Sequence, residues 1–163
     1  MKSLLKGKTI IIGLLCVAWL AVIFYNGTRQ GEVSQKSSKE IVKVISRFIN
    51  ISPATMERAS IKFSTVNFYV RKNAHFFQYL ILSILICSVA RQLKLCKSSE
   101  IFLVLFLLLL FPVADEFIQK YIPGRSSSIL DIIIDFSGGI LGMLVFSFTV
   151  RSRKRYLKTE RYF

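Results

Sequence analysis

The chain has 163 residues, of which 53% are hydrophobic, and its 23 Lys and Arg exceed its 9 Asp and Glu to give a net charge of +14. The apolar residues form long blocks without the alternation of a soluble fold, which indicates transmembrane helices in a single membrane domain. Because the basic residues flank these blocks and form no reading motif, they exclude nucleic acid as the expected partner and indicate membrane lipids with anionic headgroups.

Four spans are predicted in an all-α integral membrane protein, at about residues 9–28, 73–90, 98–118 and 129–150. A basic start precedes the first span, which has no charged residue. This pattern also describes a signal peptide, but the apolar run is longer than a typical signal core and shows no convincing cleavage site. We therefore expect an uncleaved first span.

The longest segment between spans, residues 29–70, is predicted to lie at the outer membrane surface. From Ile41 to Ile49 its apolar residues recur at helical spacing opposite a basic face, the pattern of a helix in the membrane interface. An amphipathic helix packed on the bundle would show the same pattern. The stretch from Ile61 to Val70 alternates loosely, and we expect it to be extended or to form a second interfacial turn.

The third apolar run, Ile101 to Ala114, has only 14 residues. As a helix it would span about 21 Å, less than the roughly 30 Å of the hydrocarbon core. Two arrangements are compatible with this length. Either the helix continues past Asp115 and Glu116 and brings both acids into the membrane margin, or the bilayer is thinner around it.

The orientation follows from the basic flanks. The N-terminus, the loop from Arg91 to Lys97 and the C-terminal tail are short and basic, and such segments remain in the cytoplasm. We therefore expect a multi-pass membrane protein with both termini cytoplasmic. Polar groups at a membrane margin are costly and indicate functional sites. This topology brings ten candidate ligand-binding residues to the outer face: Arg71, Lys72, His75, Tyr79, Asp115, Glu116, Gln119, Arg125, Asp131 and Asp135.

Asp131 and Asp135 are four residues apart, so both project from one face of the fourth helix. Such a pair is suited to a metal ion, a proton or a cationic group of a substrate. Asp131 also fits a capping box that starts the helix. Asp135 lies too deep to cap, and its structural alternative is a salt bridge to Arg71, Lys72 or Arg125.

The acids of the third span have a different spacing. Asp115 and Glu116 are adjacent and cannot share a face, whereas Glu116 and Gln119 can. His75, the single histidine, is either a hydrogen-bonded packing residue or a ligand that these carboxylates approach. The candidates for a catalytic role are therefore His75, Asp115, Glu116 and Asp135.

The turn at residues 123–128 contains Pro, Gly, Arg and three Ser before a predicted helix. Free N–H groups, a helix dipole and Arg125 together would suit a phosphate, while an ordinary turn with an N-cap explains the glycine and the serines. Further along, Gly138 and Gly142 provide a face for close helix packing.

The cysteines Cys16, Cys87 and Cys96 are too few and too scattered for a disulfide framework or a metal site, and we expect all three to be inert. No metal site and no cofactor is predicted.

These residues together carry a family resemblance. The matching motifs are Arg71-Lys72-Asn73-Ala74-His75-Phe76 with Tyr79, Asp115-Glu116 with Gln119, Pro123-Gly124-Arg125, Asp131, Asp135, and Gly138 to Gly142. Over about residues 70–145 they resemble the VanZ-like membrane proteins, small multi-span proteins of mainly Gram-positive bacteria. The founding member is associated with resistance to the glycopeptide teicoplanin. Members often carry a histidine where this chain has Ile118. The resemblance implies a role in the cell envelope and does not supply a reaction.

Three functions fit this site. The first and preferred one is a non-enzymatic envelope protein that contributes to glycopeptide resistance by binding a glycopeptide or a lipid-linked cell-wall intermediate. The second is a membrane-embedded enzyme acting on an envelope lipid or a peptidoglycan precursor, with His75 as general base or metal ligand. The third is a transporter or accessory subunit that relays protons or cations and forms a homo-oligomer through Gly138 and Gly142.

Overall fold

The computed structural model describes residues 2–28, 60–125 and 127–159, and in these ranges the regular elements are all helices. In chain order they are α1 (Lys2–Thr28), α4 (Ser60–Ala90), the short 3-10 helix η1 (Arg91–Leu93), α5 (Lys97–Gln119) and α6 (Ile129–Thr159). Four stretches are long and apolar enough to cross a membrane: Gly7–Thr28, Tyr69–Leu93, Lys97–Gln119 and Ile129–Arg153. The predicted all-α architecture with four long apolar helices is therefore confirmed. The predicted interfacial helix around Ile41 to Ile49 lies outside the described residues.

Two helices extend further than their apolar runs. α4 begins at Ser60, so the stretch from Ile61 to Val70 is neither extended nor a separate interfacial turn but the first part of α4. α5 continues past Asp115 and Glu116 to Gln119, which gives it 23 residues and a length of about 35 Å, enough to cross the hydrocarbon core. Of the two arrangements considered for the third span, the one with both acids inside the helix is observed.

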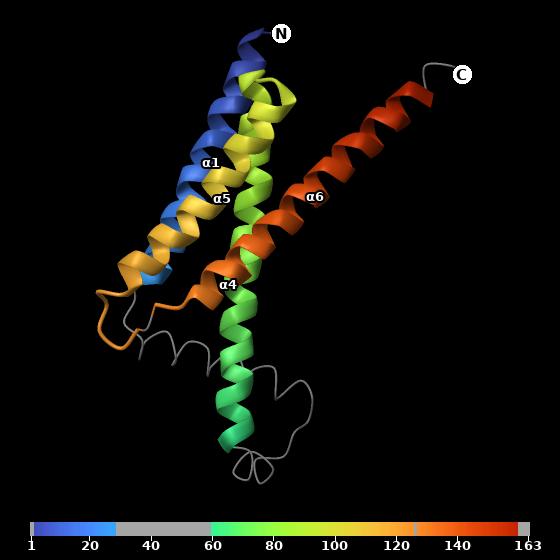
Figure 1. The fold of residues 1–163 in the computed structure, drawn as a ribbon. Coiled ribbons are helices and arrows are strands. Elements are labelled where there is room, and N and C mark those ends of the chain that lie inside the picture. The colour runs from blue at the N-terminus through green and yellow to red at the C-terminus, as the bar shows by residue number, and fades with distance from the viewer. Residues whose placement is uncertain (1, 29–59, 126, 160–163) are drawn as a thin grey trace.

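The helices form a bundle in which α1 and α5 run beside α4, and α6 crosses α4 obliquely (Figure 1). The start of α1, the α4–α5 connection and the end of α6 lie toward one end of this bundle, which we call the basic end. The ends of α1 and α5 and the start of α6 lie toward the other, which we call the polar end.

The most extensive packing in the bundle is between α4 and α6. A Cβ atom placed on Gly138 would overlap with the carbonyl oxygen of Phe76, and one on Gly142 would overlap with that of Leu80. Small residues allow two helix backbones to approach this closely. The glycine face that the sequence offers for helix packing is thus covered by α4 within one chain.

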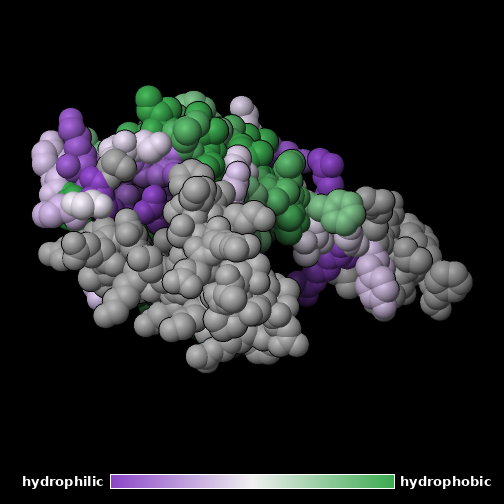
Figure 2. Space-filling view, turned by 90° about the horizontal axis from the view of Figure 1, so that it is seen from below, coloured by the Kyte–Doolittle hydropathy of each residue, from purple (hydrophilic) through white to green (hydrophobic). Residues whose placement is uncertain are grey.

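The buried core is apolar and lies between the four helices. It includes Ile23 from α1, Leu82 and Ile86 from α4, and Val104 and Leu108 from α5. α1 is also tied to α4 by a hydrogen bond of 2.9 Å that Trp19 Nε1 donates to the Gln78 carbonyl oxygen. Many large apolar side chains on the outside remain exposed, as expected for helices surrounded by lipid. In a view from the polar end, hydrophilic residues gather on the side where α5 joins α6 and adjoin a broad hydrophobic surface (Figure 2).

Candidate functional site

Polar side chains, all buried except the half-buried His75, gather where α4, α5 and α6 meet near the polar end. These residues, which we call the polar cluster, are His75 and Tyr79 on α4, Asp115, Glu116 and Gln119 on α5, and Asp135 on α6. The side chains of Tyr79, Asp115 and Asp135 are completely buried. Spacings of three or four residues place the members of each helix on one inward face. The structure thus brings together groups that are far apart in the sequence.

Two pairs of side chains link α4 to α6. Lys72 forms an ion pair with Asp131, and His75 Nδ1 lies 3.6 Å from Asp135 Oδ1. Because Lys72 and His75 are three residues apart while Asp131 and Asp135 are four apart, the two pairs lie one turn from each other along the same interface. Lys72 was one of the cations considered as a salt-bridge partner of Asp135, but it pairs with the other acid of α6.

A chain of hydrogen bonds runs from α5 through the α5–α6 connection to α1. Gln119 Nε2 donates to Asp115 Oδ2 at 3.0 Å, and Arg125 Nη1 donates to Gln119 Oε1 at 2.8 Å. Arg125 Nη2 also donates to the Asn26 carbonyl oxygen at 2.8 Å. The sequence grouped Gln119 with Glu116, whereas the structure pairs it with Asp115, one full turn away. Both spacings are compatible with a helix, and Glu116 accepts the Ser128 N–H instead.

Glu116 connects α5 to the first turn of α6. The Ser128 backbone N–H donates to Glu116 Oε2 at 2.7 Å. In the capping box expected for this helix, Asp131 would accept a hydrogen bond from that N–H. Glu116 takes the position instead, and Asp131 pairs with Lys72. Glu116 also places negative charge at the positive end of the α6 dipole, where the sequence suggested a phosphate. An external anion would therefore compete with Glu116 there.

α1 contributes to the site through its backbone, which the sequence analysis did not anticipate. The carbonyl oxygen of Asn26 accepts a hydrogen bond from Arg125. The next residue, Gly27, lies against Asp115, since a Cβ atom on Gly27 would overlap with Asp115 Oδ1. The missing side chain lets Asp115 reach the α1 backbone. A glycine near the end of an apolar span was the one available signal for this contact, since a backbone carbonyl has no sequence signature.

Several buried polar atoms of the cluster have no hydrogen-bond partner among the described residues. They are His75 Nδ1, Tyr79 Oη, Asp115 Oδ1, Glu116 Oε1, and both carboxylate oxygens of Asp135. His75, Asp115 and Asp135 each offer one ligand atom, and these atoms all lie within 4.8 Å of one another. Buried carboxylates are unfavourable without a compensating positive charge. From the sequence, His75 and the aspartates of α6 were considered as metal ligands but no metal site was predicted, whereas this geometry is suited to a cation.

Three cations, Arg71, Lys72 and Arg125, surround the polar cluster, and we call them the cationic rim. The charge of Arg71 acts on both of the other two. Burial lowers the pKa of Arg125 and the charge of Arg71 lowers it further, whereas Asp115 and Glu116 oppose this change. Because like charges gathered in one place repel each other, an anion bound among them would be stabilised.

The cluster and its rim fall within a match to a known family. Residues 12–150 match the VanZ/LLP1 family. The chain belongs to the VanZ/LLP1 family. The VanZ/LLP1 match begins before residue 70, where the sequence resemblance starts, and so takes in most of α1. Searches among curated proteins and among solved structures found no match.

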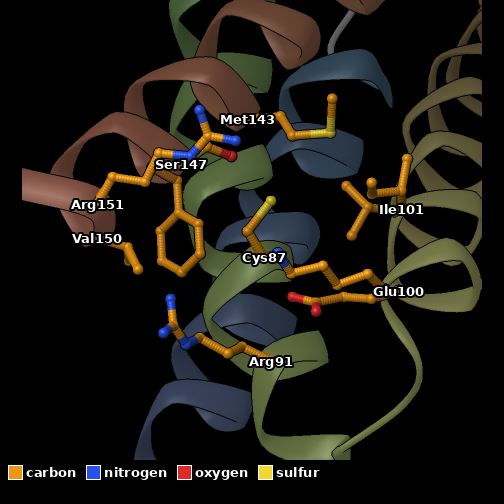
Figure 3. A pocket seen from close by; sticks show the side chains of 11 residues that line it. Cys87, Arg91, Glu100, Ile101, Met143, Ser147, Val150 and Arg151 are labelled. Carbon is orange, nitrogen blue, oxygen red and sulfur yellow. The ribbon is translucent and has the colours of Figure 1, made fainter. Parts of the chain in front are cut away.

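This VanZ/LLP1 protein also has a pocket of about 350 Å³ toward the basic end, between α4, α5 and α6. Figure 3 shows Cys87, Arg91, Glu100 and Arg151 around it, together with apolar side chains. His75 of the polar cluster and Arg91 of the pocket are separated by 16 positions, which corresponds to about 24 Å along a helix. None of the ten candidate residues lines this pocket, so it is distinct from the polar cluster.

Proposed function

We propose that this VanZ/LLP1 protein is a cell-envelope protein of a Gram-positive plasma membrane that binds a glycopeptide or a lipid-linked cell-wall intermediate. Binding takes place at the polar end, on the outer face of the membrane, and contributes to resistance against glycopeptides such as teicoplanin. The observation that carries this proposal is the cationic rim beside a buried acidic cluster. No catalytic step is required for this function.

The ligand's anionic group binds to the rim. Arg125 is held by Gln119, and Gln119 is held by Asp115. A guanidinium fixed in this way meets a phosphate or carboxylate without losing further conformational freedom, which favours affinity. The acids have the complementary role, since they fix the position of the arginine and attract the amine of a glycopeptide.

The depth of the rim fits a lipid-linked ligand. Arg71 and Lys72 belong to the first turn of the apolar stretch Tyr69–Leu93, the level at which a span enters the headgroup region. A lipid-linked intermediate carries its phosphate at that same level while its chain remains in the bilayer. The cationic rim and the phosphate of the ligand can therefore bind each other while both remain in the headgroup region.

Teicoplanin susceptibility of a sensitive Gram-positive host tests this function. We expect wild type to raise the inhibitory concentration, and Arg125→Ala and Asp135→Asn to abolish the increase at equal membrane abundance. Lys120→Ala is the matched control, because Lys120 is an exposed cation close to Arg125 in sequence and lies outside the rim. If wild type gives no protection, or if the Arg125 and Asp135 variants protect as well as wild type, the proposal is wrong.

One observation favours an enzyme as the second candidate. A carboxylate facing an imidazole nitrogen, as Asp135 faces His75 at 3.6 Å, can hold the ring in the orientation that a general base needs. The enzyme would act on an envelope lipid or a peptidoglycan precursor. Incubating the purified protein with these lipids and looking for product by mass spectrometry separates the two functions. A product formed by wild type but not by His75→Ala supports the enzyme, and unchanged lipid supports binding alone.

A further inference from the structure

We propose that His75, Asp115 and Asp135 form a binding site for one divalent metal ion between α4, α5 and α6. One donor comes from each helix, and the three ligand atoms lie within 4.8 Å of one another. This proposal does not depend on the ligand proposed for the cationic rim, because the three donors are internal to the bundle.

The need for a positive charge at this point is the first argument. Asp115 and Asp135 are completely buried. Within the described part of the chain no hydrogen-bond donor reaches either oxygen of Asp135. The neighbouring cations form their printed contacts with other groups, since Lys72 pairs with Asp131 and Arg125 bonds to Gln119 and Asn26, although their charges also act on the acids of the cluster. Buried carboxylates that are compensated only in part are unfavourable, and a cation bound between them lowers this cost.

The second argument is the orientation of the ligands. Gln119 holds Asp115 by its Oδ2 atom, and Arg125 in turn holds Gln119. Metal sites commonly have such outer partners, which fix the geometry of the direct ligands. On the other side of the site, Gly138 brings α6 against the backbone of Phe76, the residue next to His75. The distance between His75 and Asp135 is thus set by backbone packing.

The third argument is the size of the site. Metal–nitrogen and metal–oxygen bonds of about 2.1 Å separate tetrahedral ligand atoms by about 3.4 Å. His75 Nδ1 and Asp135 Oδ1, at 3.6 Å, already have nearly this separation. The outer limit of 4.8 Å requires a contraction of about 1 Å toward the ion, which side-chain torsions can provide. The hydroxyl of Tyr79, one turn after His75, is buried beside this group.

The donor set defines the class of metal. One imidazole nitrogen with two carboxylate oxygens suits Zn²⁺ or Mn²⁺, whereas Ca²⁺ and Mg²⁺ favour oxygen ligands only. Three protein ligands leave at least one position of the ion for water or for a ligand. The site thus has the arrangement of an open metal centre and not of a closed structural one.

Metal titration of the whole purified protein tests the proposal. The protein in detergent is stripped with a chelator and titrated by calorimetry with ZnCl₂ and, separately, with MnCl₂. Wild type is expected to bind one ion per chain. His75→Asn and Asp135→Asn are expected to lose at least the roughly 100-fold in affinity that outer-shell changes can cause. Asp131→Asn, which removes the same charge one turn away on α6, is the matched control and is expected to keep most of the affinity, because Asp131 is not one of the three ligands.

A second, spectroscopic test uses only the wild-type protein, so its result does not depend on whether the variants fold. Co²⁺ added to stripped wild type is expected to give visible absorption bands of a low-coordinate site, and added Zn²⁺ is expected to remove them. Absence of stoichiometric binding of all three ions overturns the proposal. Equal loss of affinity in Asp131→Asn and Asp135→Asn also overturns it, because the effect would then be one of overall charge.

Discussion

Arg125 connects three elements, although it lies in a connection that has no regular structure. Its guanidinium bonds to Gln119 on α5 and to the backbone of Asn26 at the end of α1. Removing it leaves a carbonyl and an amide oxygen without their charged donor. Hydrogen bonds to charged groups contribute about 1.5–3 kcal/mol each.

We therefore predict that Arg125→Ala lowers the free energy of unfolding by about 2 kcal/mol, because only part of each hydrogen bond's contribution is lost in a half-buried setting. Arg125→Lys is expected to recover less than half of this loss, since an ammonium group does not provide the planar fork of the guanidinium. Chemical unfolding in detergent measures both, with Lys120→Ala as control. An unchanged unfolding free energy in Arg125→Ala would show that α1 is held without this residue.

A second prediction at this scale concerns Cys96, which was expected to be inert. It is exposed in the α4–α5 connection, and its sulfur lies 3.0 Å from Ser99 Oγ. The side-chain hydrogen bond with Ser99 lowers the pKa of the Cys96 thiol, and nearby backbone N–H groups add to this effect. A lower pKa gives a larger thiolate fraction at a given pH, and the thiolate is the form that reacts.

Alkylation of Cys96 is therefore expected to reach its half-maximal rate at a lower pH than that of an ordinary thiol. Ser99→Ala is expected to move this midpoint to higher pH. The shift is measured from the rates of iodoacetamide labelling, followed by peptide mass spectrometry. The labelling is done between about pH 6 and pH 10, because this range brackets the ordinary cysteine pKa of about 8.5. Identical profiles for the two proteins would exclude the influence of Ser99.

At the level of helices, the contact between α4 and α6 determines the geometry of the polar cluster. Gly138 lies three residues after Asp135, and it packs on the carbonyl of Phe76, the residue after His75. A side chain at this position would separate the two helices at the point where they bring these two residues together. The site thus depends on a contact in which no polar group takes part.

Gly138→Ala is expected to destabilise the protein by about 1–3 kcal/mol, the usual cost of an overpacked interface. Gly13→Ala is the matched control, because no atom lies within 4 Å of a Cβ there, and a change below about 0.5 kcal/mol is expected at such an open position. Thermal unfolding in detergent compares the two. A Gly138→Ala protein as stable as wild type would mean that the α4–α6 contact is more adaptable than its geometry indicates.

The helices could be predicted from the sequence more fully than the contacts between them. Long apolar blocks identify α1, α4, α5 and α6, because a backbone in lipid must satisfy its own hydrogen bonds. Charged residues were a less reliable guide to where each helix ends, since α5 continues through Asp115 and Glu116. The convergence of His75, Asp115 and Asp135 followed from topology alone. Their partners did not, because Gln119 can reach Asp115 or Glu116 on the same helix, and Glu116 is bound by Ser128 from a connection whose path the sequence does not predict.

For the molecule as a whole, the structure places the start of α1, the α4–α5 connection and the end of α6 at the same end of the bundle. Their positive charge predicts that this end is cytoplasmic. A membrane-impermeant maleimide is therefore expected to label Cys96 in lysed spheroplasts and not in intact ones.

The reciprocal variant is Lys120→Cys combined with Cys96→Ser, which moves the thiol to the α5–α6 connection. It is expected to react in intact spheroplasts. Cys96→Ser alone gives the background from Cys16 and Cys87, which are half-buried and buried. Labelling of Cys96 in intact spheroplasts would invert the topology and place the polar cluster at the cytoplasmic face.

The hydrogen bond between Arg125 and Asn26 joins residues 99 positions apart, and this separation has a consequence for biosynthesis. α1 leaves the ribosome first and α6 last, so α5 emerges with Asp115 and Glu116 before Ser128 and Asp135 have left the ribosome. An acid inside a span raises the free energy of insertion by up to about 3 kcal/mol. During this interval α5 depends on its long apolar stretch to remain inserted. The site is completed only when the last helix arrives, and a chain that stops before α6 keeps its acids in the membrane without their partners.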